Sequence, residues 1–291
     1  MGTARSGIVL VLFAGTCFGT VGVFSKLFYD AGGTPWTLLV LRFVVTGPAI
    51  AALALLLHEA WPGRRLALAG AALGIFQFGV GYALFEGFER APIALVTLLY
   101  FAYPLITAIG ATLLYREPLG ARRAAIVVLA LTGVALTIGI PDSTNRVGIA
   151  LGLVAGLCVA ALILSSRQIM VAHGVSPIVL CALMFTSPAI GLLLATPLRS
   201  PDLDLAGDAW IWAAGTVVIG VAIPIACFYT GVKRIGASTA GLLSTAEPLV
   251  TIVLAYAVLG ESLSATQLLG GVLIVASVIA LSLQAGDPAV T

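Results

Sequence analysis

Ten apolar segments follow one another along the chain, with only short polar connections between them. Each is close to the ~20 residues that an α-helix needs to cross ~30 Å of hydrocarbon. Proline begins the second, fourth and seventh segments, where its missing N–H leaves no helical hydrogen bond unmade. We therefore predict ten membrane-spanning helices, at Gly7–Tyr29, Pro35–Leu57, Leu66–Phe88, Pro92–Tyr115, Arg122–Ile140, Val147–Val171, Pro177–Thr196, Asp208–Val232, Ala237–Leu259 and Ala265–Gln284.

The composition indicates that lipid is the solvent of this chain. Hydrophobic residues make up 60% of the 291, charged residues only 9%, and the mean hydropathy is +1.15. A soluble domain carries about 25% charged residues, and its helices have polar faces that these segments lack. The net charge of +2 is too small to indicate a nucleic-acid partner. We expect an all-α integral membrane protein whose partners are the lipid bilayer and a small-molecule substrate, with no nucleic acid.

The positions of Lys and Arg predict the orientation of the helices, because cytoplasmic loops are enriched in these residues. With the N-terminus inside, nine of them fall on the cytoplasmic side and four on the outer side, while Arg42 lies within a helix. We expect a multi-pass protein of the bacterial inner membrane with both termini in the cytoplasm. The cytoplasmic set is Arg5, Arg64, Arg65, Arg116, Arg122, Arg123, Arg167, Lys233 and Arg234, and the outer set is Lys26, Arg90, Arg146 and Arg199.

The second half of the chain repeats the first at an offset of 144 residues. The sequence FAYPLIT at 101–107 aligns with TAEPLVT at 245–251, and EPL at 117–119 aligns with ESL at 261–263. Each copy spans five predicted helices, which places the first unit at residues 1–141 and the second at 142–291.

The two units are expected to cross the membrane in opposite senses, because five is an odd number of helices. The charges agree: the loop after the fourth helix is rich in arginine, whereas the loop after the ninth, around Gly260, has no Lys or Arg. Inverted repeats recur in secondary transporters, whose halves exchange conformations across the membrane. The fold that we predict is therefore two inverted five-helix repeats around a central cavity.

The paired Pro and Glu positions resemble those of the EamA-type transporters of the drug/metabolite transporter superfamily. In each half an apolar helix with a central proline, Pro104 or Pro248, leads to a short loop with a glutamate, Glu117 or Glu261, and then to a last helix that contains glycine. The pair Arg42-Phe43 also looks like the Arg-Phe pair often met in the second helix. The resemblance covers nearly the whole chain. It implies a ten-helix bundle that moves small organic solutes, often outward and often amino acids or related metabolites.

Two charged residues, Arg42 and Glu247, lie well away from both ends of their predicted helices, where a charge costs about 2.5–3.5 kcal/mol on insertion scales. Arg42 lies about 10 Å below the outer boundary, at 1.5 Å per residue. It could bind a substrate carboxylate, form a structural ion pair or extend to the outer interface. Glu247 lies near the midplane and could bind a substrate amine, carry a proton or pair with Arg42. Pro248, directly after it, and the equivalent Pro104 are the expected hinges.

Aromatic residues with polar groups complete the predicted site, because they suit a cavity for organic solutes. Tyr103 is the repeat equivalent of Glu247, and Tyr100 lies one turn before it on nearly the same face. Tyr82 and Glu86 share part of a face on the third helix, where Glu86 could pair with Arg42 or face water. All four could equally be ordinary packing or surface residues.

Eight further residues have weaker indications of a role. Six of them could line the pore, although such side chains more often bond to their own helix: Gln77, Thr97, Ser238, Thr239, Ser244 and Thr245. Glu117 and Glu261 follow the fourth and ninth helices at opposite surfaces. We expect each of them to cap the next helix rather than to contact substrate.

Motifs of catalysis, metal binding and nucleotide binding are missing from the sequence. The four cysteines lie in apolar stretches without CxxC spacing, and the two histidines, His58 and His173, lie at helix ends. No Walker loop and no Gly-x-Ser-x-Gly elbow occurs. We therefore expect no enzyme activity, no catalytic residues, no metal and no cofactor.

The sequence favours a secondary transporter that exports amino acids or related metabolites by alternating access, with protons as a candidate coupling ion. The halves are not equivalent, since Met184 replaces Arg42 and Glu247 replaces Tyr103. An exporter of amphipathic compounds is the alternative within the same class. A membrane enzyme or a non-transporting scaffold is the alternative from another class.

Overall fold

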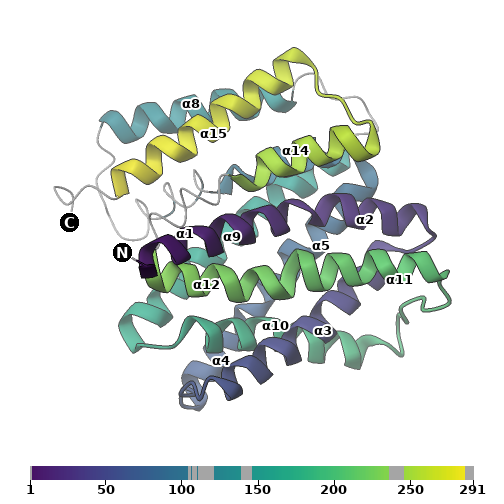
Figure 1. The fold of residues 1–291 in the computed structure, drawn as a ribbon, viewed down its shortest axis with the longest axis vertical. Helices are drawn as coiled ribbons and strands as arrows, with labels where there is room; N and C mark the ends of the chain where they lie inside the picture. The colour runs from purple at the N-terminus through teal and green to yellow at the C-terminus, as the bar shows by residue number, and fades with distance from the viewer. Residues whose placement is uncertain are drawn as a thin grey trace.

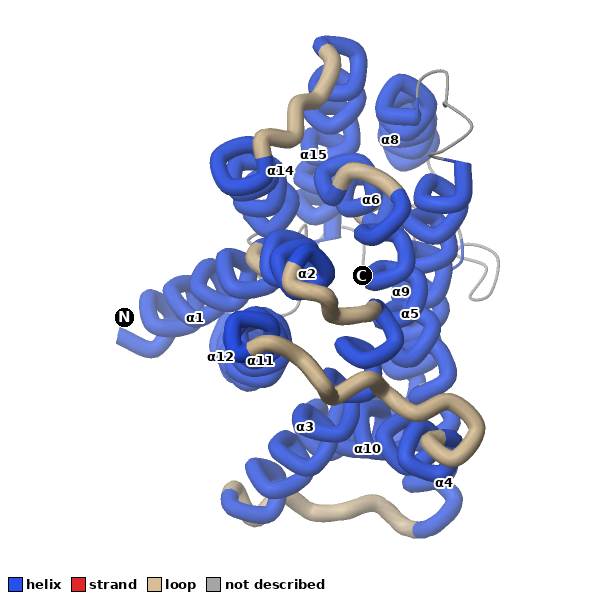
Figure 2. The backbone as a smooth tube through the Cα atoms, turned by 90° about the vertical axis from the view of Figure 1, so that its right-hand side faces the viewer, coloured by secondary structure: helices blue, strands red, loops and turns tan. Residues whose placement is uncertain are grey.

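The computed structural model describes residues 2–103, 106, 110, 121–138, 146–235 and 246–285, and every regular element within these ranges is helical. The helices lie side by side in one bundle, seen from the side in Figure 1 and nearly along the helices in Figure 2. They are α1 (Gly2–Gly19), α2 (Val21–Asp30), α3 (Pro35–Leu56), α4 (Arg64–Ala72), α5 (Gly74–Arg90), α6 (Ile93–Tyr100), α8 (Ala121–Ile138), α9 (Arg146–His173), α10 (Pro177–Ala195), α11 (Gly207–Ala214), the π-helix η1 (Gly215–Ala222), α12 (Ile223–Ile235), α14 (Ala246–Leu259) and α15 (Ala265–Ala285).

Six helical stretches of the described chain are long and apolar enough to cross a membrane, and two shorter apolar helices, Val250–Leu259 and Ala265–Ser277, accompany them. The prediction of an all-helical, multi-pass membrane protein is thereby confirmed. The count of ten crossings stays a prediction, since the expected fourth and ninth segments run partly outside the described residues. The six stretches are Arg5–Asp30, Pro35–Leu56, Arg64–Arg90, Arg146–Met170, Pro177–Ala195 and Gly207–Ile225.

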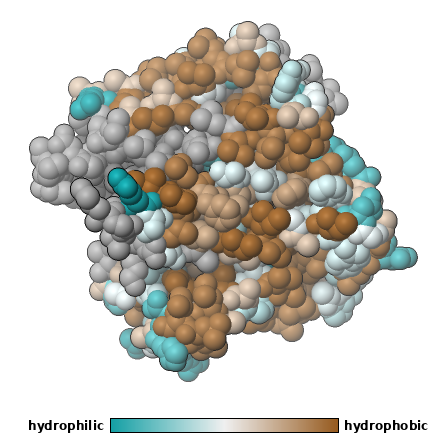
Figure 3. Space-filling model, viewed as in Figure 1, coloured by the Kyte–Doolittle hydropathy of each residue, from teal (hydrophilic) through white to brown (hydrophobic). Residues whose placement is uncertain are grey.

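The outer surface of the bundle is apolar. Leu56, Ile75 and Leu194 have 75%, 71% and 76% of their surface exposed. Figure 3 shows hydrophobic residues over much of the visible face. Exposed apolar surface of this extent is rare on water-soluble monomers and is suited to contact with lipid tails.

Three of the expected helices are interrupted in the structure. The first breaks at Thr20, whose N–H and Oγ1 both bond to the carbonyl of Cys17, at 3.1 and 2.7 Å. The third breaks at Leu73, whose carbonyl accepts the N–H of Phe76 at 3.1 Å in a tighter, 3₁₀-type turn. The eighth contains the eight-residue π-helix η1 between α11 and α12. The apolar pattern continues across all three positions and therefore gives no sign of them.

The apolar core lies between α2, α3, α5 and α10. Phe28, Leu38, Phe43 and Phe85 are fully buried there, and Phe43 contacts Phe185 with ring centroids 5.6 Å apart. These aromatic rings surround the inner face of α3, which carries the arginine described below.

Helices α3 and α10 pack against each other in antiparallel directions. The indole N–H of Trp36 donates to the carbonyl of Arg199 at 3.2 Å, and Thr37 Oγ1 accepts the N–H of Asp202 at 3.0 Å. The first residues of α3 therefore lie beside the segment that follows the C-terminal end of α10. The two backbones meet further along, where a Cβ on Gly47 would lie 3.0 Å from the carbonyl oxygen of Phe185.

Gly47→Val should destabilise the protein, because the new side chain would meet backbone rather than a movable side chain. Overpacking of this kind costs about 1–3 kcal/mol. We expect a lower midpoint of thermal unfolding in detergent. Gly191→Ala is the control, since a Cβ on Gly191, which lies in α10, would meet nothing within 4 Å. Equal midpoints for both variants would contradict the close crossing of α3 and α10.

Candidate substrate-binding cavity

A cavity of about 260 Å³ lies inside the bundle and is lined by both halves of the chain. Drug-sized ligands occupy pockets of about 300–1,000 Å³, so this volume suits a smaller solute. Most of the wall is apolar. The polar side chains that line it are Arg42, Gln77, Thr97, Tyr100, Tyr103, Glu247 and Thr251.

Arg42 reaches the cavity because of the way in which α3 begins. Thr34 is the N-cap, and its Oγ1 accepts the N–H of Thr37 at 3.2 Å, with Pro35 at the first helical position. The cap sets the register of the helix, and residues four apart then share one face. That buried face carries Leu38, Arg42, Thr46 and Ile50.

Among the described residues, the guanidinium of Arg42 has aromatic neighbours but no acidic partner. Only 7% of the residue is exposed, and its Nε has no hydrogen-bond partner. Its Cζ lies 5.8 Å from the ring centroid of Phe43, 5.5 Å from Phe85 and 5.9 Å from Phe185. In the described part of the chain no carboxylate forms an ion pair with it. Cation–π contacts stabilise the buried cation only in part, which leaves it able to bind an anion.

Glu247 enters the same cavity from the first turn of α14. Among the described residues its carboxylate forms no ion pair, so the expected pairing with Arg42 is not formed. One turn later the Thr251 hydroxyl lies 3.1 Å from the carbonyl oxygen of Glu247 and 3.1 Å from that of Gly19. Gly19 is the last residue of α1. Thr251 therefore links the turn of α14 that carries Glu247 to the end of α1, where the first expected helix is interrupted.

Tyr100 and Tyr103 line the cavity together with these two ionisable residues. Their ring centroids are 5.4 Å apart. Tyr100 is the last residue of α6, and Tyr103 follows after a turn. Of the six predicted binding residues, the structure therefore brings together Arg42, Tyr100, Tyr103 and Glu247.

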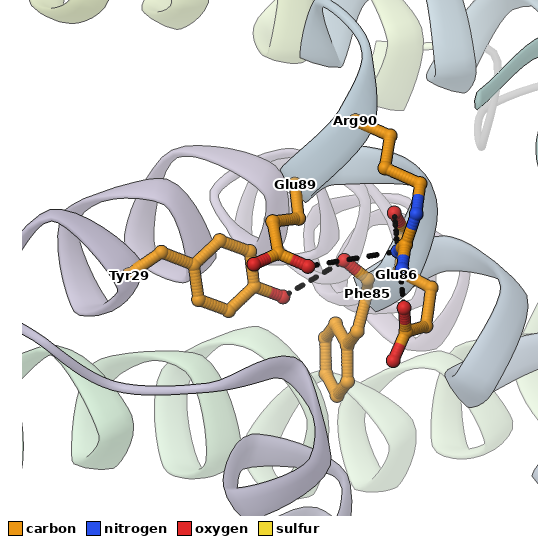
Figure 4. A network of polar contacts seen from close by, with 5 residues as sticks. All are labelled: Tyr29, Phe85, Glu86, Glu89 and Arg90. Carbon is orange, nitrogen blue, oxygen red and sulfur yellow. Dashed lines mark hydrogen bonds and ion pairs between the residues drawn. The ribbon is translucent and has the colours of Figure 1, made fainter. Parts of the chain in front are cut away.

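Tyr82 and Glu86 lie on α5 but are not among the residues that line the cavity. Glu86 forms an ion pair with Arg90, one turn along its own helix, so the alternative pairing with Arg42 is not formed. Figure 4 shows this pair beside Glu89 and Tyr29, near the end of α5. Tyr82 is 38% exposed and stacks on Phe78, with ring centroids 6.0 Å apart. Both side chains thus have contacts away from the cavity.

Three further polar residues line the cavity. Gln77 and Thr97, which the sequence indicates only weakly, are 8% and 5% exposed. The other four residues of that prediction, Ser238, Thr239, Ser244 and Thr245, lie outside the described residues. Thr251 is 3% exposed and was missed. The signal that could have found it is its position four residues after Glu247, on the same face of the helix.

Of the two prolines predicted as hinges, the structure describes one. Pro104 lies outside the described residues. Pro248 is the third residue of α14, and the residues that precede this helix lie outside the described part of the chain, so its role as a hinge stays a prediction.

Comparison with known proteins identifies two matching segments in this chain. The EamA-like transporter family model matches residues 5–139 and again residues 146–283. The overall fold is similar to that of a solved crystal structure, with a TM-score of 0.66, 18% identity and 99% of each chain covered.

Curated relatives carry transporter names. An uncharacterized transporter of Archaeoglobus fulgidus is 26% identical over 277 residues, which cover 94% of this chain and 96% of the relative. The threonine/homoserine exporter RhtA of Escherichia coli K12 is 29% identical over 215 residues, which cover 70% of this chain and 68% of the exporter. The uncharacterized transporter YcbK of Bacillus subtilis is 26% identical over 286 residues, which cover 92% and 89%. With two family matches across most of its length, the chain belongs to the EamA-like transporter family.

Proposed function

We propose that this protein is a secondary transporter that exports small zwitterionic metabolites, amino acids first among them, by alternating access. One observation carries the proposal: a buried arginine and a glutamate line one small cavity and do not pair with each other. Unpaired charges in a membrane protein are costly unless a ligand or a proton meets them. A zwitterion supplies both opposite charges in one molecule.

In the proposed mechanism each polar group of the cavity has a role. The planar guanidinium of Arg42 binds the substrate carboxylate through paired hydrogen bonds. Glu247 accepts hydrogen bonds from the substrate ammonium and, when the site is empty, carries a proton. Tyr100 and Tyr103 pack their rings along the substrate and direct their hydroxyl groups to its polar parts.

The two halves are proposed to be inverted five-helix repeats, residues 1–141 and 142–291, that form ten crossings in all. The pattern of helix contacts supports this. The expected second and seventh helices pack together (α3 with α10), as do the fifth and tenth (α8 with α15). The third packs on the sixth (α5 with α9) and the first on the eighth (α1 with α12). Exchanging the halves leaves this set of pairs unchanged, and the antiparallel course of α3 and α10 favours opposite insertion.

Orientation and direction of transport complete the proposal. The excess of Lys and Arg on one side favours cytoplasmic termini in a bacterial inner membrane. The name of the relative RhtA, a threonine/homoserine exporter, supports outward transport of amino acids. Protons are the proposed coupling ion, because Glu247 is the acidic side chain in the cavity. Pro104 and Pro248 remain the proposed hinges.

An exporter of amphipathic compounds is the second candidate. The mostly apolar wall of the cavity, which includes Phe88, Met184 and Phe228, favours it. Its volume of about 260 Å³ argues against it, because amphipathic drugs need larger pockets.

Transport by the purified protein in sealed liposomes tests the proposal directly. Liposomes loaded with one amino acid should exchange it for the same labelled amino acid outside, and an imposed proton gradient should drive net accumulation. Protein-free liposomes give the background. Exchange of amphipathic dyes without exchange of any amino acid would select the second candidate, and no exchange of either kind would overturn both.

A further inference from the structure

Glu261 joins the second half of the chain to a helix of the first half. It lies in the connection from α14 to α15, and its two carboxylate oxygens accept the N–H groups of Ile93 and Ala94, at 3.0 and 3.3 Å. These are the first two residues of α6. The expected role of Glu261 as a cap of the next helix is therefore wrong, because it caps α6 instead.

The end of α14 and the start of α6 are both shaped for this contact. Gly260 adopts φ +68° just after α14, and the N–H of Glu261 bonds back to the carbonyl of Ala255 at 3.2 Å. This left-handed helix end turns the chain so that Glu261 leaves the axis of α14. At the other end, Pro92 provides no side-chain cap for α6. The N–H groups at the start of α6 thus depend on a carboxylate from the other half.

The next helix does not need Glu261, because it has its own cap. Ser264 Oγ accepts the N–H of Gln267 at 3.3 Å, and Gln267 Oε1 accepts the N–H of Ser264 at 3.0 Å. This reciprocal pair is a capping box at the start of α15. The connection from α14 to α15 thus carries two caps. The Ser264–Gln267 pair caps α15 in the second half, and Glu261 caps α6 in the first half.

The helix that Glu261 caps also contributes to the cavity. Ile93 is fully buried, and its Cγ2 leaves no room for a Cβ on Gly22, so the first turn of α6 packs directly on α2. Gly22 itself lines the cavity, and α6 ends at Tyr100, which does so too. Figure 1 shows the α14–α15 connection at the same end of the bundle as the α2–α3 loop. In the proposed orientation this is the outer end.

We propose that Glu261 is the outer clamp of the transport cycle. Its carboxylate holds α6 against the α14–α15 connection and keeps the cavity closed to the outside, and release of the two hydrogen bonds lets the halves separate there. This inference rests on the proposed orientation and on alternating access, but it requires no particular substrate.

Thiol labelling from outside the cell tests the clamp. Cys181 lines the cavity and serves as the reporter once Cys17, Cys158 and Cys227 are replaced by alanine. A membrane-impermeant methanethiosulfonate added to intact cells should modify Cys181 at least about tenfold faster in Glu261→Ala, since the loss of even one of the two charge-assisted hydrogen bonds shifts an equilibrium by roughly that factor. Gln267→Ala is the matched control, because it removes the cap of α15 from the same connection and should leave the rate unchanged.

The outcomes separate the clamp from the proposed function. Equal rates in the parent and in Glu261→Ala, or an equal rise in Gln267→Ala, would overturn the clamp. If Glu261→Ala is not recovered folded, Glu261→Gln decides by the same readout, with a smaller rise expected because a neutral oxygen accepts more weakly. Faster labelling in a protein that exchanges no solute in liposomes would retain Glu261 as the contact that closes the cavity to the outside and would refute the transport proposal.

Discussion

Arg42→Ala should weaken the binding of an amino acid substrate by about a hundredfold or more. Each hydrogen bond to a charged group contributes about 1.5–3 kcal/mol, and a guanidinium can offer two to one carboxylate. Their joint loss of about 3 kcal/mol corresponds to about two orders of magnitude in the dissociation constant. Equilibrium binding of a labelled amino acid to the purified protein measures the effect.

Two further arginine variants make this result interpretable. Arg42→Lys keeps the charge but cannot form the paired hydrogen bonds, so its affinity should lie between those of the parent and the alanine variant. Arg90→Ala removes an arginine whose partners, Glu86 and Glu89, lie outside the cavity, and it should bind like the parent. Unchanged affinity in Arg42→Ala would contradict a carboxylate site at this residue.

Glu247→Gln should remove both the preference for an amino group and the coupling to protons. The variant keeps the size of the side chain but can neither attract an ammonium ion nor release a proton. The parent should bind an amino acid at least about tenfold more tightly than the same acid without its amino group, since a charge-assisted hydrogen bond is worth about 1.5–3 kcal/mol. In the variant the two affinities should converge, and a proton gradient should no longer drive accumulation in liposomes.

The control for Glu247→Gln is Glu59→Gln, which alters an acidic residue outside the cavity lining, in the connection between α3 and α4. It should retain both the preference and the accumulation. If Glu247→Gln still discriminates between the two ligands, the ammonium contact is refuted. If it still accumulates substrate in response to a proton gradient, Glu247 is not the proton carrier.

The sequence determines the solvent of this protein, the approximate helix ends and the residues from which a site can be built. Long apolar segments with few charges are stable in a lipid bilayer and not in water. The membrane location can therefore be inferred without knowledge of packing. Two helix starts also have their caps in the local sequence, Thr34 before α3 and the Ser264–Gln267 pair before α15, although neither was among the predictions. An arginine and a glutamate inside apolar segments are conspicuous because each charge there is costly.

Only the tertiary structure decided which of these residues meet. A helix that is apolar on all sides gives no stripe from which its rotation can be read, so the direction of Glu86 or Tyr82 cannot be derived from spacing. Glu86 thus pairs along its own helix with Arg90, while Gln77, on the same helix, lines the cavity. Glu261 shows the same principle: its spacing predicts a cap for the following helix, but packing brings the first turn of α6 within its reach. Hydropathy and capping act over a few residues, whereas the rotation and contacts of these helices are set by close packing between segments far apart in the chain.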